Sequence, residues 1–306
     1  MITISGLSKK FGKQLALDQV SFSIKEGKVF GLIGPNGAGK TTAMSILATL
    51  LLPDSGTVEV NGYNVLLNPG EVRQMIGYMP DFFGVYDGLK VTEYLEFFAD
   101  AFQVPENQKK TIISDLLELV NLSVKADFYV DTLSRGMKQR LALARCLVHD
   151  PKVLILDEPA SGLDPRARAE MKEIVYQLKQ MNKTVLISSH ILPELAEMCD
   201  EVAIMEKGRL VANGPVAEIT SAASGMRHLI IEVLERGQEL VALVRARDKV
   251  NQVQQNENLI KLTYSGTRAE QGNLLKEISQ EFLVLQFYES KGDLERLFMS
   301  VTGEVN

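Results

Sequence analysis

The chain has 306 residues with 45% hydrophobic residues, 24% charged residues and a net charge of −6, a composition typical of a globular protein with one large or two unequal domains. The acidic balance lacks the electrostatic footprint of a nucleic-acid-binding protein, so we expect no nucleic-acid partner. No segment approaches the ~20 apolar residues of a membrane span, and the N-terminus lacks the blocks of a signal peptide. Cys146 and Cys199 have no metal-binding or redox spacing and predict buried thiols.

The first sixty residues predict short antiparallel strands separated by Gly, Asp and Lys turns, at Ile2–Ile4, Ala16–Ile24 and Thr57–Val60. Within this region, the apolar run Val29–Ile33 predicts a buried strand. Thr42–Leu52 predicts a helix that ends at Pro53.

A complete phosphate-binding loop joins this strand to this helix, and it consists of Gly34, Pro35, Asn36, Gly37, Ala38, Gly39, Lys40 and Thr41, followed by Thr42. Glycines allow backbone N–H groups to turn toward phosphate oxygens, and the helix N-terminus adds partial positive charge. Lys40 is expected to reach the β- and γ-phosphates, and the Thr41 hydroxyl to bind Mg²⁺. The loop predicts that the chain binds a nucleoside triphosphate.

From Val91 to about His149 the hydrophobic period becomes helical. Helices are predicted at Glu93–Phe102 and Lys110–Val120, with a break at Pro105 between them, and a third helix is predicted to begin at Ser134.

Two fully apolar strands follow, as expected for a parallel sheet covered on both faces, at Val153–Leu156 and Thr184–Ile187. Between them, Asp164 and Pro165 predict a helix start. Val202–Met205 and Arg209–Ala212 flank Lys207-Gly208 and predict a hairpin. The first part of the chain is therefore an α/β fold with an inserted helical block.

Small and polar residues predict a linker at Thr220–Gly225, and a second module follows it. Its predicted elements are strand His228–Glu235, helix Glu239–Arg247, strand Val250–Gln254, strand Leu259–Tyr264, helix Arg268–Gln280, strand Leu283–Tyr288 and a last helix from Asp293. This order is that of a split βαβ, ferredoxin-like α+β domain.

A carboxylate pair follows the strand Val153–Leu156. Asp157, at the carboxyl end of a buried strand, is expected to lie beside the phosphate loop and to hold Mg²⁺. Glu158, one residue further on, is placed to polarise the attacking water. The loop and this pair together indicate nucleotide hydrolysis.

These motifs and several others resemble, in order, those of the nucleotide-binding subunits of ABC (ATP-binding cassette) transporters, over about residues 1–219. The family signature Leu-Ser-Gly-Gly-Gln is similar to Leu133-Ser134-Arg135-Gly136-Met137. The dimer loop of the family is similar to Ala160-Ser161-Gly162-Leu163-Asp164, and its switch histidine is similar to His190. Phe11 stands where the family has an aromatic residue that stacks on adenine, and the glutamine loop belongs at Tyr78-Met79-Pro80-Asp81.

The resemblance implies a P-loop NTPase cassette over residues 1–219, with a RecA-like core, an antiparallel β subdomain and a helical subdomain at about 91–149. Residues 220–306 would form an accessory domain. It also implies that two cassettes, identical or different, bind head to tail. Each ATP would then lie between one phosphate loop and the Ser134 and Gly136 of the other subunit, with Lys40, Glu158 and His190 in catalytic roles.

The sequence departs from the family pattern at two places. Arg135 and Met137 replace Gly and Gln in the signature, and we interpret both as subfamily variation because the phosphate-facing positions Ser134 and Gly136 are intact. Asp81 replaces the glutamine. It is one methylene shorter and charged, so it is either a candidate Mg²⁺ ligand or a link between the site and the helical block.

The segment Asp81–Tyr86 contains Phe82, Phe83 and Val85. These apolar side chains either pack against the helical block or form the groove in which this family receives a helix of the membrane subunit, because exposed apolar patches commonly mark interfaces. The second alternative predicts contact with an integral membrane permease.

The resemblance implies an ATPase that drives a separate permease at the cytoplasmic face of the cell membrane, and the small α/β tail is similar to bacterial exporter ATPases. The alternative is a soluble regulatory cassette of translation or DNA repair, but such relatives usually carry two cassettes or a long coiled coil, and the sequence has neither. A GTP switch is disfavoured because Val185 stands where the guanine-reading pattern of Asn182 and Lys183 requires Asp.

Overall fold

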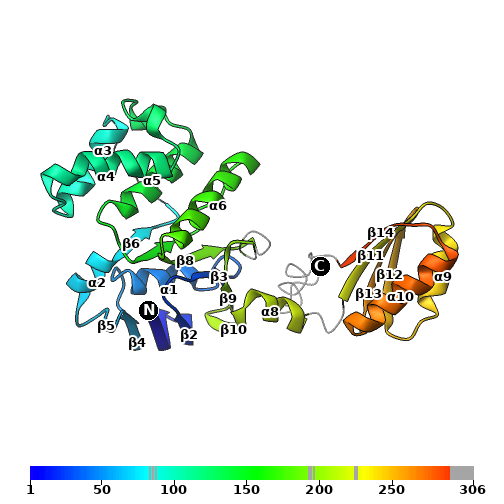
Figure 1. The fold of residues 1–306 in the computed structure, drawn as a ribbon. Coiled ribbons are helices and arrows are strands. Elements are labelled where there is room, and N and C mark those ends of the chain that lie inside the picture. Colours follow the sequence, from blue (N-terminus) through cyan, green and yellow to red (C-terminus); the bar gives the residue numbers. More distant parts are fainter. Residues whose placement is uncertain are drawn as a thin grey trace. The chain divides into compact units, whose positions relative to one another are not determined.

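The computed structural model describes residues 1–82, 84, 86, 88–191, 195, 197–223 and 227–289, with the side chains of 220–223 and 228 left aside. The chain divides into two compact units, Met1–Val216 and Ala217–Asn306. Figure 1 shows the elements of each unit. Among the described residues, no helix has both the length and the apolar character needed to cross a membrane.

The first unit begins with an antiparallel sheet in the order β2-β1-β4-β5. Its strands are β1 (Ile2–Phe11), β2 (Gln14–Ile24), β4 (Ser55–Val60) and β5 (Tyr63–Asn64). The first two strands are longer than predicted because they pair from Ile2↔Ile24 to Phe11↔Gln14, with register shifts on the way. Such shifts interrupt the regular alternation by which a strand is recognised in a sequence.

A second sheet has the order β10-β9-β3-β8-β7-β6. Its strands are β3 (Val29–Ile33), β6 (Ile76–Met79), β7 (Val153–Leu156), β8 (Thr184–Ser189), β9 (Glu201–Glu206) and β10 (Arg209–Pro215). All pairs are parallel except β9–β10, which forms the predicted hairpin. The short strand β6 was not predicted.

Helix α1 (Lys40–Leu47) lies between the two sheets, since its apolar residues belong to one buried cluster with Phe22 of the first sheet and Phe30 of the second. The prediction that this helix extends to Leu52 is wrong. Thr49 adopts the left-handed conformation (φ 63°). The N–H groups of Thr49 and Leu50 donate to the carbonyls of Ile46 and Ser45 at 3.0 and 2.9 Å, which closes the helix before Pro53 is reached.

Helix α2 (Pro69–Met75) lies near β5 and precedes the inserted block, whose helices α3 (Val91–Ala101), α4 (Glu106–Leu119) and α5 (Arg135–Leu147) lie together (Figure 1). The block also contains the short 3-10 helices Ser123–Lys125 and Val130–Thr132. Helix α4 begins four residues before the predicted start, directly after its N-cap Pro105. Helix α5 packs closely on β6, because a Cβ atom added to Gly77 would lie 2.3 Å from the Cys146 carbonyl oxygen.

Helix α6 (Pro165–Gln180) begins where predicted, since the side chain of Asp164 accepts the Ala167 N–H at 2.8 Å. Helix α8 (Val216–Ala223) corrects the predicted linker at Thr220–Gly225, because residues 220–223 are helical. The remaining linker residues, 224 and 225, lie outside the described residues. Alanines and Ile219 around these positions favour a helix once it has begun.

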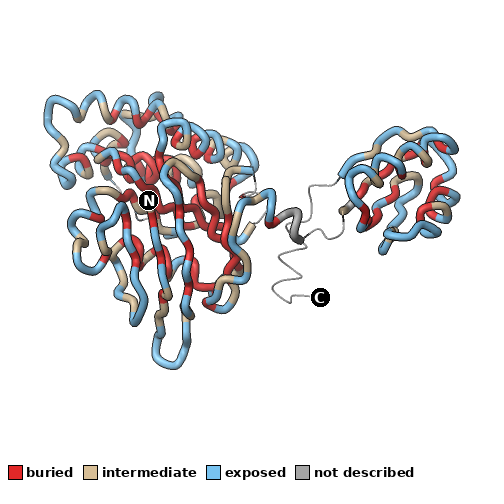
Figure 2. The backbone as a smooth tube through the Cα atoms, turned by 60° about the horizontal axis from the view of Figure 1, so that its bottom comes forward, coloured by how far each residue is buried: buried red, intermediate tan, exposed pale blue. Residues whose placement is uncertain are grey.

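The second unit is a β-α-β-β-α-β module with sheet order β12-β13-β11-β14 and antiparallel pairs. Its elements are β11 (Arg227–Val233), α9 (Gly237–Arg245), β12 (Val250–Asn256), β13 (Leu259–Tyr264), α10 (Arg268–Glu281) and β14 (Val284–Glu289). The order matches the split βαβ arrangement predicted from the sequence. Leu229, Leu240 and Ile278 belong to a separate hydrophobic core, visible as buried backbone inside this unit in Figure 2. The helix predicted from Asp293 lies outside the described residues.

Candidate functional site

Three parallel neighbours, β3, β8 and β7, bring distant segments to one edge of the second sheet. Ile33 at the end of β3 pairs with Ser189, and Leu156 at the end of β7 pairs with Ile187. The phosphate loop, the Asp157–Glu158 turn and His190 therefore leave the sheet side by side, at the carboxyl edge where ligands bind in open α/β sheets.

The phosphate loop depends on glycine where its backbone approaches neighbouring segments. A Cβ atom added to Gly34 would lie 2.5 Å from the Met205 carbonyl oxygen, and one added to Gly39 would lie 2.5 Å from that of Ala16. Gly39 also has a φ of 104°, a conformation that favours glycine. Asn36 and Gly37 at the loop tip are exposed, and so is Thr41 at the helix start. Pro35 and Thr42 are partly buried, whereas Ala38 is buried.

Lys40 is almost completely buried, with 6% of its side chain exposed. Its ammonium group donates to the carbonyl oxygens of Gly34 at 2.7 Å and Pro35 at 3.3 Å. It also forms an ion pair with Glu158, with 3.3 Å between Nζ and Oε1. The Lys40 ammonium group therefore contacts both the backbone of its own loop and the predicted catalytic carboxylate of Glu158.

Asp157 is fully buried, and its N–H donates to the Met79 carbonyl at 2.8 Å. Oδ1 accepts a hydrogen bond of 2.5 Å from Ser188 Oγ, whereas Oδ2 has no hydrogen-bond partner within the part of the chain that the structure describes. Burial is the main cause that raises the pKa of this carboxyl, and Glu158 and Asp81 add to it because both place negative charge nearby. A buried carboxylate with one free oxygen is suited to bind a cation.

Glu158 follows in the left-handed conformation, with a φ of 50° that is uncommon for a residue with a side chain. Its carboxylate oxygen Oε2 lies 2.9 Å from Nδ1 of His190. Its backbone N–H donates to Ser188 Oγ at 2.8 Å. The turn aims the glutamate toward Lys40 and His190, so the three predicted catalytic side chains meet at one place.

No role was predicted for Ser188, because two consecutive serines at the end of an apolar strand match no catalytic motif. It is completely buried, and its hydroxyl contacts both Asp157 and Glu158. The available signal is its spacing: Ser188 and His190 are two positions apart, and residues at this separation along a strand share a face.

Ser134 and Gly136 lie at the start of α5. The Ser134 hydroxyl caps this helix by accepting the Met137 N–H at 3.4 Å, as predicted. Gly136 packs against α6, since an added Cβ atom would lie 3.0 Å from the Ala167 Cβ.

Arg135, the departure from the family signature, contacts the dimer loop. Its guanidinium donates to the Ser161 carbonyl at 3.2 Å, and the Gln139 amide donates to the same oxygen at 3.2 Å. A Cβ atom added to Gly162 would lie 2.6 Å from Arg135 Cζ, so the guanidinium would have to move; Gly162 also has a φ of 67°, which favours glycine. The substituted arginine therefore ties the signature to the dimer loop of its own chain.

Phe11 ends β1 and is 51% exposed, with the Lys9 ammonium 5.7 Å from its ring centre.

In the segment Asp81–Tyr86, Phe83 and Val85 lie outside the described residues. Phe82 is 91% exposed. Tyr86 is about half exposed but packs on the aromatic rings of α3, with 5.4 Å between its centroid and that of Phe97. The segment therefore contains both a packed and an exposed aromatic residue.

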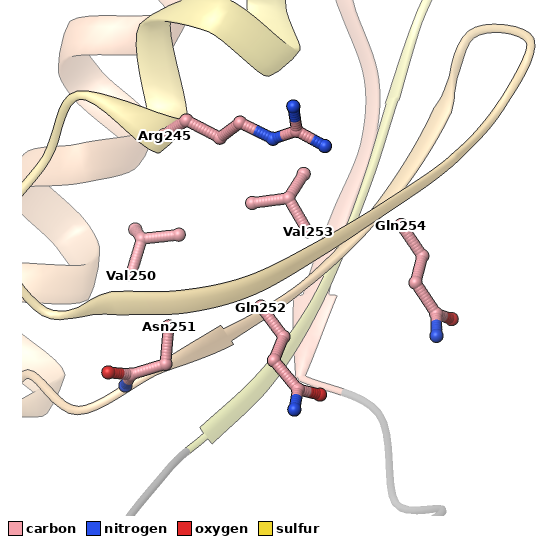
Figure 3. A pocket seen from close by; sticks show the side chains of 6 residues that line it. All are labelled: Arg245, Val250, Asn251, Gln252, Val253 and Gln254. Carbon is pink, nitrogen blue, oxygen red and sulfur yellow. The ribbon is translucent and has the colours of Figure 1, made fainter.

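An open pocket of about 620 Å³ lies in the second unit along β12. Figure 3 shows its lining residues, Arg245, Val250, Asn251, Gln252, Val253 and Gln254. None of the residues of the phosphate loop or the carboxylate pair contributes to it. Cys146 is buried as predicted, whereas Cys199 is only partly buried, and burial is the main cause that raises the pKa of both thiols.

Comparisons with known proteins agree with this arrangement. The ABC transporter family matches residues 17–161. The linearmycin resistance ATP-binding protein LnrL of Bacillus subtilis is 32% identical over 99% of this chain and 98% of its own length. The Nod factor export ATP-binding protein I of Ralstonia nicotianae is 37% identical over 79% of this chain and 74% of its own length.

A solved structure described as the ATP-binding subunit of an ABC transporter is 30% identical, with a TM-score of 0.66 over 72% of this chain and 92% of the other. CbiO1 of Clostridium perfringens, described as part of the transporter complex cbiONQ, is 27% identical over 72% of this chain and 90% of its own, with a TM-score of 0.65. The match to LnrL covers nearly the whole length of both chains. Together with the phosphate loop and the carboxylate pair, it shows that the chain belongs to the ABC transporter family as one of its ATP-hydrolysing subunits.

Proposed function

We propose that this ATPase works as a dimer of cassettes that drives export through a separate membrane permease, at the cytoplasmic face of the cell membrane. The observation that carries the proposal is the meeting of Lys40, Glu158 and His190 at one sheet edge, in a chain similar to ATP-binding proteins named for Nod factor export and linearmycin resistance. Export by this chain is inferred from those names.

In the proposed mechanism, Lys40 exchanges the Gly34 and Pro35 carbonyls for the β- and γ-phosphates of ATP. This exchange also weakens its ion pair with Glu158 and leaves that carboxylate free to orient the attacking water. His190, already in contact with Glu158, helps to hold the carboxylate and faces the transferred group. Catalysis is then mostly positioning and charge neutralisation.

The residues at the site fit Mg²⁺, because the buried Asp157 carboxylate keeps one oxygen without a partner among the described residues, and the Thr41 hydroxyl is near enough to this carboxyl to oppose the rise in its pKa. We assign Thr41 and Asp157 as the residues that would hold the ion. Mg²⁺ supplies charge neutralisation on the phosphates when bound. We assign the loop residues Gly34 to Thr42 to the phosphates and Phe11 to stacking on adenine, which its exposed ring allows.

The composite site is proposed to be completed by Ser134 and Gly136 of a second subunit. The capped end of α5 offers N–H groups and partial positive charge, which suit a γ-phosphate. Contact with the permease is assigned to Asp81–Tyr86, where Phe82 exposes its ring. Residues 220–306 are proposed as an accessory domain, because their core is separate from that of the cassette.

Mixing two inactive variants tests the composite site. Ser134→Arg damages the site of the partner, whereas Glu158→Gln damages the site of its own chain. Each variant alone should hydrolyse ATP poorly, and the mixture should recover part of the wild-type rate, because a mixed dimer contains one site with both residues intact. Steady-state ATPase assays of the separate and mixed proteins measure this recovery. A mixture no faster than the sum of its components would reject a site shared between subunits.

Asp81→Asn tests whether Asp81 approaches the metal. The carboxylate of Asp81 already contributes to raising the pKa of Asp157. If it acts on the ion, its neutralisation should raise the Mg²⁺ concentration for half-maximal ATPase activity by about tenfold. Asp115→Asn, on the exposed face of α4, is the matched control. Equal Mg²⁺ titrations for Asp81→Asn and the wild type would leave Asp81 only as a link to the helical block.

A further inference from the structure

We propose that Ser188 is a positioning residue of this ATPase, whose hydroxyl orients the metal-binding carboxylate of Asp157 and at the same time holds the turn that presents Glu158. The proposal rests on the proposed function of this site and assigns a task to a residue outside the motifs. It begins from one oxygen atom with two partners: Ser188 Oγ donates to Asp157 Oδ1 at 2.5 Å and accepts the Glu158 N–H at 2.8 Å.

The first partner decides which way the aspartate points. Asp157 is fully buried, and the hydrogen bond from Ser188 occupies Oδ1, whereas Oδ2 has no partner among the residues that the structure describes. A carboxylate in which one oxygen is held and one is free has a defined rotation about its side chain. The oxygen that is available to a divalent cation therefore points in one direction. Because the carboxylate is already ordered, less conformational entropy is lost when the ion binds.

The second partner stabilises an unfavourable backbone conformation. Glu158 has a φ of 50°, and a residue with a side chain in this region needs compensating contacts. The acceptor for its N–H is a buried hydroxyl, so loss of this hydroxyl leaves a donor unsatisfied beside the strain. Ser188 thus links the position of the metal-binding residue to the position of the residue that orients water.

The position of Ser188 in the chain couples these contacts to the switch histidine. Ser188 and His190 lie two residues apart at the end of β8, and both contact the Asp157–Glu158 turn, one through Oγ and the other through Nδ1. Ser189, between them, has a different role: its hydroxyl accepts the Ile191 N–H at 2.9 Å. The two neighbouring serines therefore provide a matched comparison within one strand.

The experiment compares Ser188→Ala with Ser189→Ala, both in the full chain. Calorimetry of ATP binding to Glu158→Gln chains at a series of Mg²⁺ concentrations reads the metal effect without turnover. Ser188→Ala should require about tenfold more Mg²⁺ to reach the same ATP affinity. ATP binding without Mg²⁺ should be unchanged, and Ser189→Ala should match the parent. In chains with Glu158 intact, kcat should fall about tenfold more for Ser188→Ala than for Ser189→Ala.

Ser188→Thr separates the hydroxyl from packing, because it keeps the donor and acceptor. We expect its Mg²⁺ dependence to stay within about twofold of the parent. An equal shift in the Ala and Thr variants, or no shift in Ser188→Ala, would overturn the role of Ser188. Absence of any Mg²⁺ effect on ATP binding by the parent chain would instead count against the proposed function, so the two failures are distinguishable.

Discussion

Replacement of Glu158 by glutamine is expected to abolish most turnover while ATP binding persists. The glutamine retains the shape of the side chain and one oxygen that can accept from His190, which lies 2.9 Å from Oε2 in the structure. It loses the charge that polarises water, a contribution typically worth about 10²- to 10⁴-fold in rate. Single-turnover hydrolysis and equilibrium ATP binding, measured on the same preparation, separate the two effects.

This variant should also accumulate as an ATP-bound dimer, since the step that releases the partner is blocked. Size-exclusion chromatography with light scattering in the presence of ATP measures that species. Glu118→Gln, on the exposed side of α4, controls for the general effect of a lost negative charge. Hydrolysis by Glu158→Gln at the wild-type rate would show that another group orients the water.

Replacement of Lys40 by alanine is expected to weaken ATP binding itself. Hydrogen bonds to a charged group contribute roughly 1.5–3 kcal/mol, so the dissociation constant for ATP should rise about 10- to 150-fold. Hydrolysis should be lost as well, because the same ammonium group neutralises charge during phosphoryl transfer. Calorimetric titration with ATP and Mg²⁺ measures the affinity.

Lys207→Ala provides the control, since the side chain of this lysine is 88% exposed and forms an ion pair with Glu206 at the surface. Glu158→Gln and Lys40→Ala are both expected to lose turnover and differ in ATP affinity, which Glu158→Gln keeps and Lys40→Ala loses. Unchanged ATP affinity in Lys40→Ala would contradict the assignment of the phosphate loop. Thermal unfolding of each variant tests that the fold is intact, which matters because Lys40 is buried against Gly34 and Glu158.

Local sequence patterns were sufficient to predict the strands that precede the phosphate loop and the carboxylate pair. Val29–Ile33 and Val153–Leu156 are strands with the predicted bounds, because continuous apolar runs between turn residues define buried strands well. Where local signals compete, the observed bounds differ from the predicted ones. Helix α1 ends at Leu47, before the left-handed Thr49, rather than at Leu52, and residues 220–223 belong to α8. The β6 segment is too short and contains Gly77, which weakens a strand signal.

Contiguous motifs were therefore enough to predict the nucleotide substrate and the family, and to single out Lys40, Asp157 and Glu158 as candidate site residues. Only the tertiary structure decided that β8 lies between β3 and β7. This strand order brings Ser188 to Asp157, 31 residues away, and His190 to Glu158, 32 residues away. The tertiary structure also places the guanidinium of Arg135 against Gly162. Contacts of this kind depend on which strands and helices become neighbours, and that choice is made by the packing of the whole cassette.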